Sequence, residues 1–85
     1  MSSGKIAGMT EAKDKAAREA LGRAIAKRRD ELDLSQEELA FRAEMHRSYL
    51  GDVECGKRNL SLKNILKICR GLKVSAFELF KLAGL

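Results

Sequence analysis

An all-α fold is predicted from two features of this 85-residue chain. Apolar residues recur at three- and four-residue spacing over most of its length, and no segment shows the alternation of a strand. The chain has no Pro or Trp and only 5% aromatic residues, so its core must consist mainly of Leu, Ile and Ala, which suit helices. This length allows one small domain with one core, and it disfavours a roomy enzyme pocket.

Charge and composition narrow the classes of partner. The net charge is +5, from 17 Lys and Arg against 12 Asp and Glu, which fits either a polyanionic partner or a mixed-charge surface. Cys55, Cys69 and one His are too few for a zinc site, and Cys69 lies on an apolar helix face as a buried thiol. No apolar run is long enough to cross a membrane. We expect a cytoplasmic protein without cofactor, metal, membrane or small-molecule ligand.

The N-terminal part of the chain is predicted to contain a leader and a first helix. Residues 1–9 are small and polar and are predicted to form a flexible leader, followed by one domain over residues 10–85. Thr10 is a good N-cap for a first helix that runs to about Glu31. The apolar stripe of this helix consists of Ala17, Ala20, Leu21, Ala24, Ile25 and Leu32.

Two short helices with a tight turn are predicted next, over about 35–43 and 46–54. Ser35 and Glu38 make a capping box at the start of the first of them. In the second, Leu50 and Val53 face inward, while the opposite side offers Arg47, Ser48, Gly51 and Asp52. A short helix with one face packed against the domain and a polar opposite face has the shape that enters a DNA major groove.

Two further helices complete the chain. Gly56 is a predicted helix stop, and Ser61 caps a fourth helix that ends at Gly71, with Leu62, Ile65, Leu66, Cys69 and Leu72 inward. Ser75 caps a fifth helix, about 75–83, through a second capping box. The apolar side chains near its end are too many for one small core: Phe77, Leu79, Phe80, Leu82 and Leu85. They predict a dimer interface, and the alternative is that they complete the monomer core.

Three strings in order resemble one family over about Leu21 to Phe80: S-Q-E-E-L-A, Y-L-x-D-V-E-x-G-K-R-N-L-S and V-S-x-x-E-L-F. They resemble the Cro/C1-type, or XRE-type, helix-turn-helix regulators. That resemblance implies a compact five-helix, lambda-repressor-like domain from a bacterium or phage that binds a palindromic operator in double-stranded DNA as a homodimer. The run H-R-S-Y followed by K-R-N is most similar to controller proteins of restriction–modification systems. The chain departs from the family pattern at Glu44, where Gly is common, and at Cys55, where polar or basic residues are common.

The recognition helix, about 46–54, carries the predicted base contact. Arg47 suits the O6/N7 pair of guanine, and the alternatives are a phosphate contact or a solvated side chain. The resemblance to controller proteins implies that Ser48 and Tyr49 could contact DNA. Tyr49 could equally be a half-buried ring whose hydroxyl is solvated. His46 opens the helix and is expected to cap it or to lie near the DNA backbone. Asp52 could accept from cytosine, but it more readily orients Arg47 or remains solvated.

The other predicted contacts are to the DNA backbone. The resemblance implies that Gln36 holds a phosphate and braces the recognition helix. We expect Lys57, Arg58 and Asn59 to contact the DNA backbone at a position further along the duplex. Arg29 and Glu54 match a family ion pair with a structural role, and the alternative is an unpaired surface charge.

Two other classes of function compete with DNA-binding regulation. One is an antitoxin-like protein-interaction module whose apolar C-terminal helix binds another protein, with DNA binding secondary. The other is an enzyme, which the chain disfavours because it offers no nucleophile–base pair, phosphate loop or metal cluster.

Overall fold

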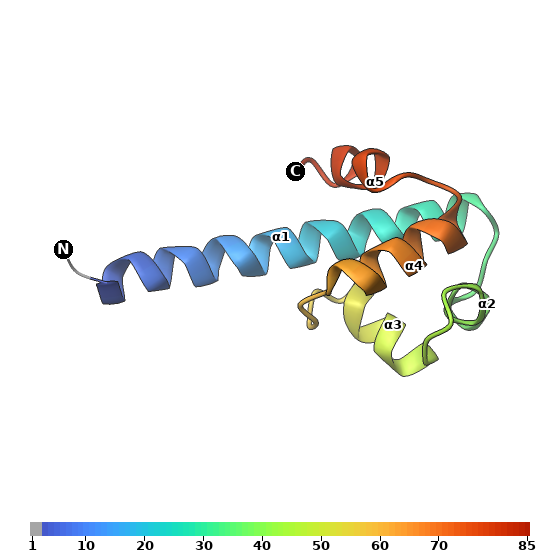
Figure 1. Cartoon of the computed structure of the whole chain (residues 1–85), viewed down its shortest axis with the longest axis horizontal. Helices are drawn as coiled ribbons and strands as arrows, with labels where there is room; N and C mark the ends of the chain where they lie inside the picture. The colour runs from blue at the N-terminus through green and yellow to red at the C-terminus, as the bar shows by residue number, and fades with distance from the viewer. Residues whose placement is uncertain (1–2) are drawn as a thin grey trace.

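The computed structural model describes residues 3–85, with side chains from Thr10 onward, and this part of the chain contains five helices and no strand. Their bounds are α1 Ser3–Glu31, α2 Gln36–Arg42, α3 Arg47–Glu54, α4 Leu62–Leu72 and α5 Ala76–Leu82. Helix α4 lies along α1, with α2 and α3 on one side of this pair and α5 on the other (Figure 1). The predicted all-α, five-helix fold is confirmed.

Helix α1 starts earlier than the sequence indicated. It begins at Ser3 rather than after an N-cap at Thr10, so the expected leader at residues 1–9 is helical from Ser3, and residues 1–2 lie outside the described part. No Pro interrupts this stretch, so nothing forces the helix to begin at the favourable cap residue. The N-terminal half of α1 projects beyond the other helices (Figure 1).

Serine caps fix the start of three helices. Ser35 and Ser75 each accept the backbone N–H of the glutamate three residues on, and Glu38 and Glu78 accept the serine N–H in return, all at 3.0 Å. Ser61 accepts the backbone N–H of Asn64 at 3.2 Å. All three predicted caps are confirmed.

Every helix ends in the same local structure. A residue with positive φ follows, and the next N–H returns to the carbonyl five residues back, as in Met45 N to Ala40 O at 2.9 Å. Gly56, the predicted helix stop, takes this position after α3, and Gly84 takes it after α5. Glu44 takes it in the turn between α2 and α3, with a φ of 54°. Asp33 and Lys73 do the same after α1 and α4, where an L side chain raises the backbone energy.

Gly71 was wrongly predicted to end the fourth helix. It lies inside α4, where a Cβ would come within 2.8 Å of Leu39 Cδ1. Its missing side chain therefore allows α2 to approach α4 closely, and the helix continues to Leu72.

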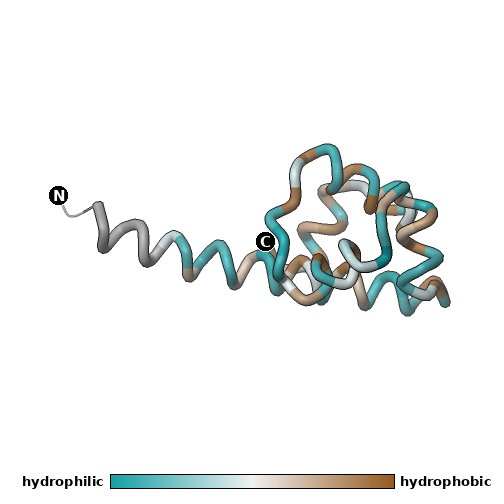
Figure 2. The backbone as a smooth tube through the Cα atoms, turned by 90° about the horizontal axis from the view of Figure 1, so that it is seen from below, coloured by the Kyte–Doolittle hydropathy of each residue, from teal (hydrophilic) through white to brown (hydrophobic). Residues whose placement is uncertain are grey.

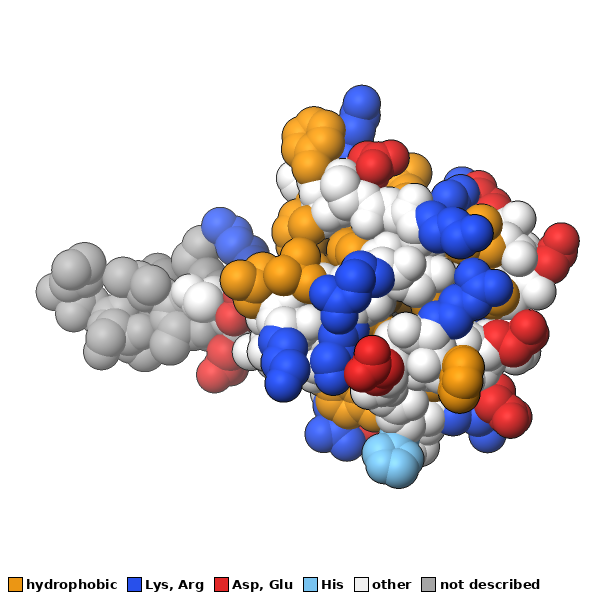
Figure 3. Space-filling model, turned by 45° about the vertical axis from the view of Figure 1, so that its right-hand side comes forward, with side chains coloured by type: hydrophobic (Ala, Val, Ile, Leu, Met, Phe, Trp, Pro, Cys, Tyr) orange, Lys and Arg blue, Asp and Glu red, His pale blue; other side chains and the backbone are white. Residues whose placement is uncertain are grey.

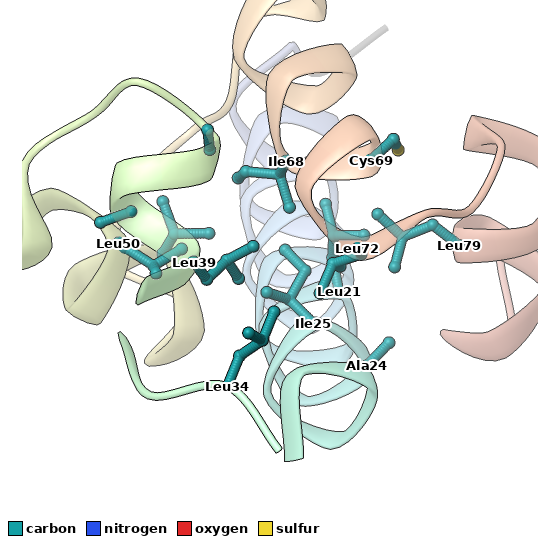
Figure 4. Close-up of a cluster of buried hydrophobic side chains, with 13 residues drawn as sticks. Leu21, Ala24, Ile25, Leu34, Leu39, Leu50, Ile68, Cys69, Leu72 and Leu79 are labelled. Carbon is teal, nitrogen blue, oxygen red and sulfur yellow. The ribbon is translucent and has the colours of Figure 1, made fainter. Parts of the chain in front are cut away.

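The core forms where α2, α3, α4 and α5 meet the C-terminal half of α1. Leu39 and Leu50 approach Ile25 from one side, and Leu72 and Leu79 from the other (Figure 4). All five side chains are fully buried. Hydrophobic residues mark the core-facing turns of these helices, whereas the projecting part of α1 is mostly hydrophilic from Thr10 onward (Figure 2).

Two expected core and interface assignments are wrong. Leu62 and Leu66 are exposed, and Ile68 fills the core from α4 instead, because the buried stripe of this helix is rotated from the predicted one. Leu79 cannot belong to a dimer interface, because it is fully buried among the other helices. Phe77 and Leu82 remain exposed at 75% and 59%, and Phe80 is partly buried.

Gly22 makes possible the contact between α1 and the end of α3. A Cβ here would lie 2.5 Å from the backbone oxygens of both Val53 and Glu54. Gly22→Ala should therefore destabilise the protein by about 1–3 kcal/mol, as overpacked sites do. Gly51→Ala is the matched control: Gly51 is also helical, but a Cβ there meets only the Gln36 amide at an ordinary contact distance of 3.7 Å, so the substitution should stabilise by about 0.5–1 kcal/mol. Chemical denaturation measures both, and equal effects would contradict the close approach.

The two capping boxes predict a specific pH dependence of stability. The hydrogen bond from the backbone N–H of Ser35 lowers the pKa of Glu38 from its ordinary 4.5, and Ser75 acts likewise on the pKa of Glu78. A lowered pKa in the folded state stabilises the fold above the ordinary pKa, and this stabilisation is lost as the pH falls through the lowered value. Replacing both by Gln should flatten the decline in unfolding free energy between roughly pH 5 and 3. Glu37→Gln is the control, and an unchanged slope in the double variant would refute the assignment.

Candidate nucleic-acid interface

The outer face of α3 and the loop after it carry most of the predicted contact residues. His46, Arg47 and Ser48 are exposed at the start of α3, and Lys57, Arg58 and Asn59 are exposed in the loop. His46 is the N-cap residue, as expected, but its side chain makes no capping hydrogen bond. Among the described residues, Arg47 and Lys57 have no side-chain hydrogen bond or ion pair. These two cations are therefore available to a partner.

A three-residue network behind α3 sets its position. Arg29 Nε donates to Glu54 Oε2 at 2.8 Å, and Nη2 donates to Oε1 at 3.1 Å, so the predicted ion pair is a two-point contact between α1 and α3. Arg29 Nη1 also donates to the carbonyl of Leu34 at 2.8 Å. Gln36 Nε2, at the start of α2, donates to Glu54 Oε1 at 2.9 Å. The network therefore ties the ends of three helices together.

The network is largely shielded from water. The Arg29 side chain is 15% exposed and that of Glu54 only 6%. The hydrogen bond to Glu54 raises the pKa of Arg29 above its usual value. The two side chains are therefore paired in a largely buried contact, and the bracing role expected for Gln36 has a geometric basis. The amide of Gln36 also lies beneath Gly51, at 3.7 Å from a Cβ built there.

A second cluster joins α3, the loop and α4 around Tyr49. Arg58 Nε donates to Asp52 Oδ2 at 3.3 Å, and its guanidinium lies 5.2 Å from the centre of the Tyr49 ring. Asn64 Nδ2 donates to the Tyr49 hydroxyl at 3.1 Å. Asp52 therefore orients Arg58, not Arg47 as predicted, because the loop folds back over this side of α3.

The contacts of two residues in this region were not predicted from the sequence. Asn64 contacts Tyr49 from the first turn of α4, and only its proximity to the Ser61 cap could have drawn attention to it. Arg18 Nε donates to the Gly56 carbonyl at 3.2 Å and so holds the loop backbone against α1. Its partner lies 38 residues away, so no local pattern could have revealed it.

The outer face of α3 and the loop after it carry basic side chains at defined positions rather than a dense cluster of positive charge. Lys and Arg side chains are spread over it with acidic side chains between them (Figure 3). Glu54 and Asp52 are both paired with arginines, so they add little net negative charge. The described part of the chain contains no group of three or more potential metal ligands. None of its helices is both long and apolar enough to cross a membrane.

Helices α2 and α3, with their positive-φ turn and the polar outer face of α3, define a helix-turn-helix protein. The helix-turn-helix family model matches residues 25–79, more than half of the chain, so the chain belongs to this family. The resemblance to XRE-type regulators is thereby confirmed.

Several relatives are named as restriction–modification controllers. The control protein C.BamHI of Bacillus amyloliquefaciens is 49% identical over 47 residues, which cover 55% of this chain and 58% of that protein. The chain thus spans less than two thirds of the length of C.BamHI. The controller C.AhdI of Aeromonas hydrophila is 44% identical, with a TM-score of 0.70, over 72% of this chain and 92% of that one.

A third relative draws attention to three positions. The controller protein C.Esp1396I is 31% identical, with a TM-score of 0.73, over 79% of this chain and 87% of that one. Its solved variants replace an arginine, a tyrosine two residues later and an arginine nine residues after that. Arg47, Tyr49 and Arg58 have the same separations here.

Removing one partner of the Arg29–Glu54 pair should strongly destabilise the fold. Glu54→Ala would leave the largely shielded Arg29 guanidinium without its two-point partner, which should cost about 3 kcal/mol of unfolding free energy. Replacing both residues, Arg29→Met with Glu54→Leu, should recover much of that loss because no unpaired charge remains. Urea denaturation of the two single variants and the double variant measures this coupling. Additive losses would contradict it.

Proposed function

We propose that this protein is a sequence-specific transcription regulator that binds a palindromic operator as a homodimer, as the controller of a restriction–modification system. The observation that carries the proposal is the outer face of α3. Arg47 is exposed there and has no partner in the described part of the chain, while the neighbouring acids Asp52 and Glu54 are already paired. A free guanidinium on a braced helix suits the O6/N7 pair of guanine. The regulator acts in the cytoplasm, on the nucleoid.

Backbone contacts surround this helix in the proposed complex. Lys57, Arg58 and Asn59 lie in a loop that Arg18 and Gly56 hold against α1. Gln36 is braced by Glu54 at the start of α2, where helical N–H groups also favour a phosphate. These contacts set the register of α3 on the duplex, and base reading falls to α3 itself.

The homodimer uses the exposed apolar side chains of Phe77, Leu82 and Leu85 together with the partly buried Phe80. Phe77 and Leu82 line a shallow hollow between α1 and α5, together with Val74 and Lys81. A two-fold arrangement places two copies of α3 in successive major grooves, about 34 Å apart. Two copies double the few specific contacts that one domain can make.

A gel-shift titration against the DNA upstream of the protein's own gene, at two salt concentrations, tests the proposal. We expect specific binding that weakens at the higher salt, because phosphate contacts release counterions. Absence of both specific binding and salt dependence would overturn the proposed function.

Arg47 and Lys57 should respond differently in that titration. Arg47→Ala should weaken specific binding by about 1–3 kcal/mol and relax preference at one base pair of each half-site. Lys57→Ala should weaken binding to all sequences alike and reduce the salt slope by about one unit per protomer. Lys27→Ala, on the exposed side of α1, is the control for loss of charge alone. Equal effects of the Arg47 and Lys57 variants on every sequence would refute the separate roles.

A further inference from the structure

The Tyr49 side chain is held on two sides by groups from other elements. From α4, Asn64 Nδ2 donates to its hydroxyl oxygen at 3.1 Å. From the loop, the Arg58 guanidinium covers the ring at 5.2 Å and is itself tied to Asp52 at 3.3 Å. The half-buried ring therefore has a defined position at the junction of α3, the loop and α4.

The chemistry of this hydrogen bond determines where the phenolic proton can go. A tyrosine hydroxyl has one proton to donate and can also accept, whereas the NH₂ of asparagine can only donate. When Asn64 donates to the hydroxyl oxygen, the phenolic proton must point away from that NH₂ group. Among the described residues, no acceptor receives this proton. The hydroxyl is therefore a donor without a protein partner, next to the exposed Arg58.

The position of Asn64 is itself fixed by the helix cap. Its backbone N–H donates to the Ser61 side chain at 3.2 Å, which places it in the first turn of α4. Its side chain then reaches across to α3. Two hydrogen bonds thus connect the start of α4 with the outer face of α3: one from Asn64 to the Ser61 cap, and one from Asn64 to the Tyr49 hydroxyl.

We propose that Asn64 is a positioning residue that orients the Tyr49 hydroxyl as a donor to a phosphate oxygen of bound DNA. Phosphate oxygens only accept hydrogen bonds, so they match a hydroxyl whose accepting side already has a donor. The adjacent Arg58 adds positive charge at the same place. This inference rests on the proposed DNA binding, and it assigns Asn64 a role beyond that of stabilising α4.

The chemistry makes Asn64→Asp the decisive substitution. Aspartate has nearly the same shape, but it accepts hydrogen bonds, so it would capture the phenolic proton and turn it away from DNA. Asn64→Leu removes the donor without offering an acceptor, so the hydroxyl remains free to donate. We expect Asn64→Asp to weaken DNA binding clearly more than Asn64→Leu does.

A double-mutant cycle with Tyr49→Phe separates this effect from the added negative charge. In the Phe background no phenolic proton exists, so Asn64→Asp reports only the repulsion between its charge and DNA. We expect its loss of affinity to be about tenfold greater in the Tyr background than in the Phe background, as for a hydrogen bond to a charged group. Fluorescence anisotropy with the upstream DNA measures all four proteins, and thermal melts correct for any unfolded fraction.

The outcomes distinguish this inference from the proposed function. If the wild-type protein binds DNA and Asn64→Asp has the same effect in both backgrounds, the role of Asn64 is refuted and DNA binding stands. If Tyr49→Phe binds as tightly as wild type, the role of Asn64 is likewise refuted. If the wild-type protein binds no DNA, the proposed function fails and this inference fails with it.

A measurement without DNA tests the direction of the hydrogen bond. In ¹⁵N-labelled protein, a side-chain amide proton of Asn64 should shift and exchange faster with water in Tyr49→Phe, because its acceptor is lost. Asn59, an exposed asparagine of the loop, is the internal control and should not change. An unchanged Asn64 amide would overturn the proposal independently of any DNA titration.

Discussion

The Arg29–Glu54 contact, extended by Gln36, is the interaction on which the placement of α3 depends. It joins α1, α2 and α3 at their ends through two-point hydrogen bonding, with Glu54 only 6% exposed. Gly22 brings the α1 backbone against the last turn of α3, so the carboxylate and guanidinium meet at short range. A short helix of eight residues has little stability of its own, so tertiary contacts of this kind must hold it in place.

The acidic residues near the outer face are explained by the same network. A face rich in acids would repel DNA, yet Glu54 and Asp52 each neutralise an arginine and orient it. Arg47 and Lys57 remain free among the described residues. The proposed binding thus rests on a few cations at defined positions rather than on bulk charge, in agreement with the modest net charge of +5.

The starts of α2, α4 and α5 and most of the core could be predicted from the sequence because they rest on local rules, whereas the start of α1 could not. Ser35, Ser61 and Ser75 cap their helices as local patterns require, and Gly56 and Gly84 end theirs. The misassignments involve contacts between distant segments. Gly71 serves the approach of α2, Leu79 fills the core, and Asp52 meets Arg58 only because the loop folds back. The roles of Asn64 and Arg18 depend on partners 15 and 38 residues away, which no spacing rule reveals.

In the proposed complex, two braced copies of α3 read one DNA site together, and hydroxyl-radical footprinting of the upstream DNA can detect this. We expect protected tracts on one face of the duplex, in two half-sites whose centres lie about 10 base pairs apart, or a multiple of that distance. A single protected half-site, or uniform protection of any sequence at the concentrations that bind the site, would contradict it.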